Sequence, residues 1–305
     1  MLCSALQAAF AGGCEPRHPL PPVSLKDMGP CGFDIKTMSF AGDAKTQAMC
    51  LMRSLDRTRN LGPMLGSLPD AISSRVGSET GLPSREVLSS FLAEQNIELD
   101  IAASLWQPLS RADDNDPVAP TARYFVIHDT SGPNFGRRDF PDDLDDDPKI
   151  NNLAQFRCSD GWERAHVFIN REGEFLLGHD YGAAWRATKF ERAVEFDGAL
   201  KGLFIHNELI QPRRTDRELG RRNDAATPSP AFTPAQYNRL ALLYIMASVR
   251  AGHWLIPAFH AAIDADIPGG HDDPLNFDIG AFATAIDTVM EQLRNPATRQ
   301  ALQGP

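Results

Sequence analysis

Residues 254–278 read WLIPAFHAAIDADIPGGHDDPLNFD. An apolar run ends at His260, and His271 and Asp273 follow together after a turn-rich loop. Two imidazoles and several carboxylates on a loop that follows a buried segment suit a divalent metal with nitrogen and oxygen ligands. Zinc in a catalytic site takes three protein ligands and leaves a fourth position for water. This stretch can supply two ligands, so a third must come from elsewhere in the chain.

The best candidate for the third ligand is His128 in ARYFVIHDTSG, residues 122–132. The apolar run over Tyr124–Ile127 predicts a short buried strand that His128 ends. With His260 and Asp273 it forms a set of two nitrogen ligands and one oxygen ligand. A metal ion held by this set would lower the pKa of a bound water toward about 7. A single histidine at a strand end is more often structural, so the hypothesis depends on all three residues.

A carboxylate that is not a ligand should handle protons in such a site. Glu208 suits this role, because it stands in the apolar stretch GLFIHNELI, residues 202–210, which would otherwise avoid charge. The alternative is an edge-strand glutamate that faces solvent.

The composition is typical of a soluble globular protein, with 42% hydrophobic and 23% charged residues. The formal net charge of −10 argues against nonspecific nucleic-acid binding and against docking on an anionic membrane. We expect no integral membrane segment, because no apolar run approaches the roughly 20 residues that a membrane helix needs.

The five cysteines include no CxxC pair, so a thiolate zinc site is not expected. Cys31 and Cys50 form either a disulfide or two free buried thiols. The N-terminus, MLCSALQAAFAGGC, resembles a short secretory apolar region without a basic start. It is read either as an export signal or lipidation site at Cys14, which would make the protein periplasmic or secreted, or as an ordinary N-terminal arm.

Four segments are predicted along the chain. Residues 1–30 form an arm or leader, and residues 31–106 form a small helical domain of unknown role. Its helices begin after Asp43, near residue 65 and after Ser84. Residues 107–122 are polar and proline-bearing, which is typical of a linker. Residues 123–305 form the domain that carries the metal site.

The last segment mixes strand and helix patterns. Residues 165–177 predict a β-hairpin and residues 202–210 a further strand. A long helix begins at Pro234 with Thr233 as its N-cap and is closed by Gly252, and a last helix covers about 279–293. Strands interspersed with helices predict the α/β class.

A series of six blocks resembles the zinc-dependent N-acetylmuramoyl-L-alanine amidases of the type 2 amidase and peptidoglycan-recognition-protein superfamily. The blocks cover about residues 120–280 and are FVIHDTSG, AHVFINREGEF, GAAW, FIHNELI, FTPAQYNRLALL and H…PGGHDDP…FD. The resemblance implies a central mixed β-sheet flanked by helices. It also implies a hydrolase that cleaves the amide between N-acetylmuramic acid and L-alanine in cell-wall peptidoglycan or muropeptides.

The resemblance also assigns roles by position. It implies zinc ligation by His128, His260 and Asp273, with Glu208 orienting or deprotonating the zinc-bound water. His271 stands where many members have a lysine that stabilises the oxyanion, a role that requires a protonated imidazole. His166 and Trp185 match residues that line the groove for the glycopeptide substrate, and Arg186 follows Trp185 where a histidine is frequent.

Two departures leave alternatives open. Phe259 replaces the usual glycine before the second ligand, and the loop from His260 to Asp273 is longer than is typical of the family. The longer loop leaves room for His271 to be the ligand, although His260 is preferred because it ends the buried segment beside the strand of His128. A binding module that keeps the fold without turnover is one alternative function, and an antibacterial amidase effector with the same chemistry is another.

Overall fold

The computed structural model describes residues 14, 23–25, 31–56, 58–95, 97, 104–159, 161, 163–220, 223–265 and 267–295. The predicted arm or leader over 1–30 therefore lies outside the described residues except for Cys14 and residues 23–25. Among the described residues, no helix is both long enough and apolar enough to cross a bilayer.

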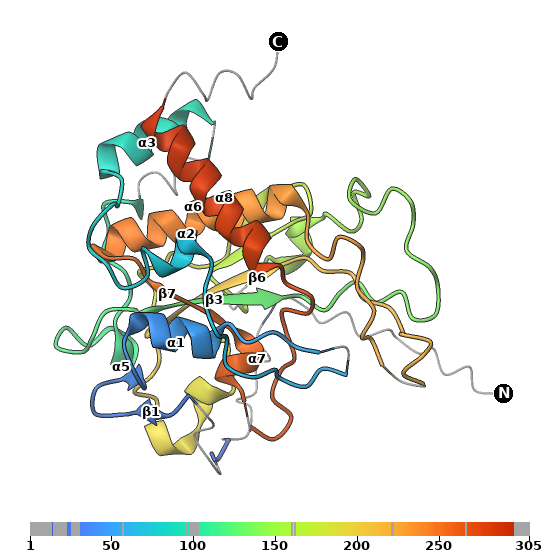
Figure 1. Ribbon diagram of the computed structural model, residues 1–305, viewed down its shortest axis with the longest axis horizontal. Helices are drawn as coiled ribbons and strands as arrows, with labels where there is room; N and C mark the ends of the chain where they lie inside the picture. Colours follow the sequence, from blue (N-terminus) through green and yellow to red (C-terminus); the bar gives the residue numbers. More distant parts are fainter. Residues whose placement is uncertain are drawn as a thin grey trace.

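A five-stranded mixed sheet forms the centre of the molecule, in the order β5–β4–β6–β3–β7 (Figure 1). Strands β4, β6, β3 and β7 run parallel, and β5 pairs antiparallel with β4. The strands are β3 (Tyr124–Asp129), β4 (Val167–Ile169), β5 (Phe175–Leu177), β6 (Phe204–Leu209) and β7 (Ile256–Phe259). The prediction of an α/β fold is confirmed, as are the hairpin over 165–177 and the strand over 202–210. The apolar run before His260 proves to be the edge strand β7.

Helices cover both faces of the sheet (Figure 1). Helices α6 (Pro234–Ala251) and α8 (Ile279–Arg294) lie on one face, whereas α1 (Ala44–Leu51) and α7 (His260–Ile263) lie on the other. Successive residues of β3 show this alternation. The Phe125 ring packs on Tyr244 of α6 with ring centroids 5.3 Å apart. The Tyr124 hydroxyl points the other way and donates to Gln47 Oε1 of α1 at 2.8 Å.

The long helix α6 begins and ends as its sequence predicts. The Thr233 hydroxyl accepts from the backbone N–H of Gln236, whose side chain accepts from the backbone N–H of Thr233, and Pro234 takes the first helical position. Gly252 ends the helix in the left-handed conformation with φ 79°. The N-caps Asp43 of α1 and Ser84 of α3 (Arg85–Glu94) are likewise confirmed.

The segment before the sheet is less helical than its sequence suggests. Besides α1 and α3 it holds the hairpin β1 (Phe33–Asp34) and β2 (Ser39–Phe40), and the helix predicted near residue 65 is the single turn α2 (Asp70–Ser73). Its side chains share one buried core with the sheet. Trp254 Nε1 beside β7, for example, donates to the Thr80 carbonyl at 3.0 Å. The predicted division into domain, linker and domain stays a prediction.

Short one-turn elements fill the connections between the larger ones. They are α5 (Ala112–Asn115) and the 3₁₀ turns η1 (Leu153–Phe156), η2 (Phe190–Arg192) and η3 (Val194–Phe196). Helix α5 lies within the predicted linker and buries Ala112. The turn η2 matters most for the site, because it carries the buried Glu191.

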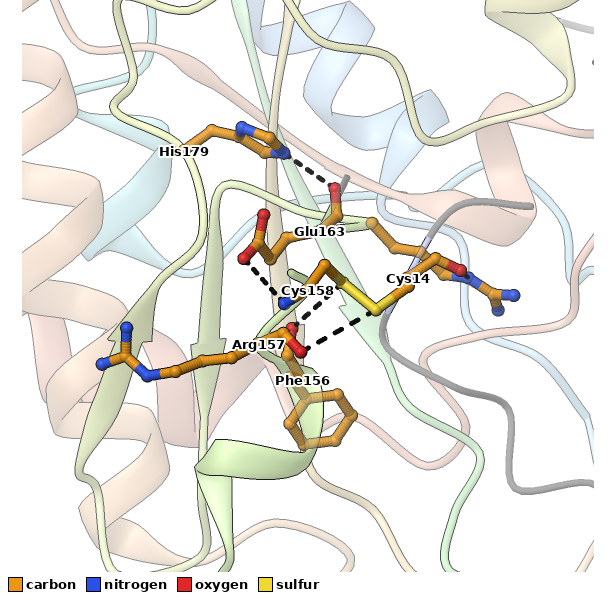
Figure 2. Close-up of a disulfide and its surroundings, with 7 residues drawn as sticks. Cys14, Phe156, Arg157, Cys158, Glu163 and His179 are labelled. Carbon is orange, nitrogen blue, oxygen red and sulfur yellow. Dashed lines mark hydrogen bonds between the residues drawn. A yellow bond between two sulfur atoms is a disulfide. The ribbon is translucent and has the colours of Figure 1, made fainter. Parts of the chain in front are cut away.

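Two disulfides tie distant parts of the chain together. Cys31 and Cys50 join the start of the β1–β2 hairpin to α1, with Cα atoms 5.8 Å apart, so the disulfide alternative is confirmed. Cys14 bonds to Cys158 across 144 residues, a pairing that the sequence did not suggest. Figure 2 shows Glu163 beside this bridge, accepting from the Cys158 backbone N–H at 3.0 Å. While bonded, the Cys14 sulfur offers no thiol for the predicted lipid.

Candidate metal centre

The carboxyl ends of three parallel strands bring the candidate residues to one edge of the sheet. His128 in β3 lies directly opposite Glu208 in β6, so both side chains point to the same face. On the other side Ile127 pairs with Phe259 of β7, which places His260 next to His128 one residue later. Strand pairing thus gathers residues that are far apart in the sequence.

The three predicted ligands form one buried group. Ligand atoms of His128, His260 and Asp273 all lie within 4.8 Å of one another. The two imidazole Nδ1 atoms are 2.8 Å apart, and Asp273 Oδ1 is 3.1 Å from His260 Nδ1. Asp273 Oδ2 is 3.6 Å from His128 Nδ1. A tetrahedral zinc site with bonds of about 2.0–2.2 Å separates its ligand atoms by about 3.3–3.6 Å, so the group has the size of a single-ion site.

The outer nitrogens of the two imidazoles already have partners. His260 Nε2 is 3.1 Å from Asp264 Oδ2, and His128 Nε2 is 3.0 Å from His206 Nδ1. The inner Nδ1 atoms therefore converge on each other and on a carboxylate. Two nitrogen lone pairs at this distance repel unless a proton or a cation lies between them. The residues present can hold a metal ion, and their donor set suits a borderline cation such as zinc.

The pKa values of the group show that it attracts positive charge. Burial would lower the pKa of His260, but Asp273 and Asp264 outweigh it and raise this pKa well above the ordinary value. Burial and the neighbouring His260 lower the pKa of His128 well below its usual range. Although burial opposes it, His260 holds the pKa of Asp273 well below the ordinary value. A cation entering the site would thus replace a proton on His260.

Asp273 is held in place by backbone and ionic contacts. Its carbonyl accepts from the backbone N–H of Ala261 at 2.8 Å, and its Oδ2 accepts from that of Asp129 at 3.1 Å. Asp129 is itself fixed by a fully buried ion pair with Arg213, at 2.6 Å. The loop that carries the ligand is therefore bonded to the ends of both β3 and β7.

Glu208 lies beside the group without belonging to it. Its Oε2 atom is buried, and it has no hydrogen-bond partner among the described residues. Burial, together with the negative charge of Asp273, raises the pKa of this carboxyl to about 8. A buried carboxyl oxygen left open next to a metal-ligand group is suited to accept a proton from a reacting molecule.

His271 lies at the exposed mouth of the site, with 56% of its side chain accessible. Its ring stacks on that of His260 with centroids 4.5 Å apart, and its Nδ1 is 3.5 Å from Asp273 Oδ1. The buried group that can hold a metal contains His260 rather than His271. The oxyanion role of His271 stays a prediction.

The three predicted substrate contacts differ in accessibility. His166 is fully buried, its Nδ1 accepting from the His206 backbone N–H at 3.0 Å and its Nε2 lying 3.1 Å from the Ala183 carbonyl. Trp185 is half-buried and stacks on His179 with ring centroids 4.1 Å apart, and Arg186 is half-buried. Their substrate roles stay predictions, and the two backbone contacts of His166 account for its burial without one.

Sequence reasoning missed three buried residues that support the ligands: His206, Glu191 and Asp264. His206 was detectable, because it precedes Glu208 by two positions in a strand and so shares its face. Asp264 follows His260 by four positions, one helical turn. Glu191 carried no local signal, since η2 reaches the site only through the fold.

Comparison of the chain with models of protein families, with curated proteins and with solved structures finds no match.

Proposed function

We propose that this protein is a zinc-dependent N-acetylmuramoyl-L-alanine amidase that acts on peptidoglycan or its fragments. One observation carries the proposal. The buried group of His128, His260 and Asp273 lies one strand away from Glu208, whose buried oxygen has no partner among the described residues. Three ligands beside an uncoordinated acid are the minimal set for metal-assisted hydrolysis of an amide. The six-block resemblance selects the substrate from among the possible amides.

A zinc ion, when bound, supplies the Lewis acidity that polarises an amide carbonyl and acidifies water. The positive charge of a bound ion would lower the pKa of Glu208 and favour its ionised form. Glu208 then takes the proton of the attacking water, and the water oxygen forms the new bond to the carbonyl carbon. Glu208 then passes that proton to the amide nitrogen as the carbon–nitrogen bond breaks, so a carboxylic acid and a free amine leave. His271, at the mouth of the site, donates a hydrogen bond to the carbonyl oxygen as negative charge develops there.

The two disulfides support an extracytoplasmic location, because such bonds persist in oxidising compartments. A periplasmic or secreted protein would meet its peptidoglycan substrate there. An antibacterial effector would use the same chemistry on foreign cell walls.

The direct test incubates the purified protein with muropeptides and measures released stem peptide by mass spectrometry. We expect release with zinc, none after chelation, and recovery when zinc is restored. Glu208→Gln should keep bound zinc and lose activity by a factor of about 10² to 10⁴. Muropeptide binding without cleavage by the fully zinc-loaded protein would refute the amidase and favour a recognition module.

A further inference from the structure

The two imidazoles of the metal centre are supported differently on their outer sides. His260 Nε2 meets the carboxylate of Asp264 directly at 3.1 Å. His128 Nε2 meets a second imidazole instead, His206 Nδ1 at 3.0 Å. His206 Nε2 in turn faces both carboxylate oxygens of Glu191, Oε1 at 3.4 Å and Oε2 at 3.2 Å. His128, His206 and Glu191 are all buried, so water does not compete for these bonds.

The Glu191 carboxylate, at the end of the hydrogen-bonded series His128–His206–Glu191, determines which nitrogen of each imidazole carries the proton. An ionised carboxylate only accepts, so His206 carries its proton on Nε2 and presents a lone pair at Nδ1. That lone pair fixes the proton of His128 on Nε2, which leaves the Nδ1 lone pair facing His260 and Asp273. When Glu191 is ionised, it therefore acts through two imidazoles to favour the tautomer that exposes the metal-binding nitrogen.

Burial and hydrogen bonding act on Glu191 in opposite directions, because burial favours the neutral form whereas three donors favour the ionised form. Its Oε2 accepts from the backbone N–H groups of Ala187 and Thr188 at 3.1 and 3.0 Å and from the Thr188 hydroxyl at 2.9 Å. Burial nevertheless raises the pKa of Glu191 to about 8, so the ionised form predominates above that pH. The same donors anchor the carboxyl group firmly beside His206.

We infer that His206 and Glu191 are positioning residues that hold His128 in its metal-binding tautomer. The inference rests on the metal centre of the proposed function and is independent of the substrate. Hydrogen-bonded partners of this kind typically change metal affinity by a factor of 10 to 100.

The test variant is Glu191→Gln. Its amide oxygen can keep the place of Oε2 and the three donors there. The amide nitrogen then takes the place of Oε1, 3.4 Å from His206 Nε2, and turns an N–H group toward it. A donor there reverses both hydrogen bonds and places the proton of His128 on Nδ1. We expect zinc affinity to fall about 10- to 100-fold, measured at pH 8.5 by competition with a chromophoric chelator.

The matched control is Tyr181→Phe. It removes a buried hydroxyl bonded to Asn207, the neighbour of His206 whose side chain points to the opposite face of the sheet. Its zinc affinity should stay within a factor of two of wild type. Wild-type affinity in Glu191→Gln, or an equal loss in both variants, would overturn the inference.

A second measurement needs only the zinc-loaded wild-type protein. Nitrogen-15 spectra of its histidine side chains should show His128 and His206 protonated on Nε2. Protonation of His206 on Nδ1 would overturn the inference even if Glu191→Gln failed to fold. A protein with the expected tautomers that cleaves no muropeptide would refute the amidase alone. An active amidase with unchanged affinity in Glu191→Gln would refute the positioning role alone.

Discussion

Replacing Glu208 by glutamine should stabilise the metal-free protein at neutral pH while greatly reducing the proposed activity. The folded structure raises the pKa of Glu208 from 4.5 to about 8 by burial and by the charge of Asp273. The folded state therefore holds the proton more tightly than the unfolded chain. Stability from this group is complete below pH 4.5 and is lost as the pH rises to about 8.

The size of the effect follows from that window. Each pKa unit corresponds to about 1.4 kcal/mol, so at pH 7 the wild-type protein is penalised by about 3 kcal/mol at Glu208. Glutamine is neutral at every pH and avoids this penalty. We expect the melting temperature of Glu208→Gln to exceed that of wild type by roughly 5 °C at pH 7. Near pH 4.5, where Glu208 is also largely neutral, the two proteins should melt together.

The assay is thermal unfolding of both proteins in excess chelator at several pH values between 4.5 and 8. Glu79→Gln is the control, because this exposed acid should change stability by less than about 0.5 kcal/mol at any pH. A Glu208→Gln variant less stable than wild type at pH 8, or a difference that does not change with pH, would refute the argument that the fold raises the pKa of Glu208.

Three further outcomes are expected. His260→Ala should lose bound zinc whereas His271→Ala retains it, which metal analysis after dialysis would show; the reverse result would make His271 the ligand. Arg213→Met leaves the Asp129 carboxylate buried without its ion-pair partner, and it should reduce the free energy of unfolding by about 3–5 kcal/mol. Urea titrations measure this loss, and a loss below about 1 kcal/mol would contradict the pairing. Thr233→Ala removes the buried N-cap of α6 and the 2.6 Å hydrogen bond that its hydroxyl donates to the Arg171 carbonyl. It should lower the free energy of unfolding by about 1–2 kcal/mol in urea titrations, whereas Thr233→Ser keeps the hydroxyl and should not.

The local signals in the sequence predicted the elements that depend on local chemistry. Helix α6 has an N-cap, a proline at its first position and a closing glycine, all of which act within a few residues. Strand β3, which carries His128 and ends one residue later at Asp129, is indicated by the compact apolar run that precedes this histidine. The candidate ligand group could also be predicted, because His260 directly follows an apolar segment that is typical of a buried strand.

What the sequence could not reveal depends on contacts between distant segments. Glu191 reaches His206 from a 3₁₀ turn, and no pattern around residue 191 indicates a partner in β6. The Cys14–Cys158 bridge spans 144 residues, and spacing alone cannot choose among cysteine pairings. The sequence of residues 31–97 carries helix signals, but it does not reveal that these residues share one core with the sheet.

The pairing of β3 with β7 has a consequence for which ions the centre accepts. His128 and His260 follow directly paired positions of these strands, so the backbone hydrogen bonds limit how far the two imidazoles can separate. A calcium ion needs oxygen ligands at about 2.3–2.6 Å and six to eight of them. The space between the two imidazoles and Asp273 offers too few oxygen ligands for calcium, and its ligand atoms lie too close together. We therefore expect the backbone hydrogen bonds between β3 and β7 to favour small ions that form short bonds to nitrogen over calcium.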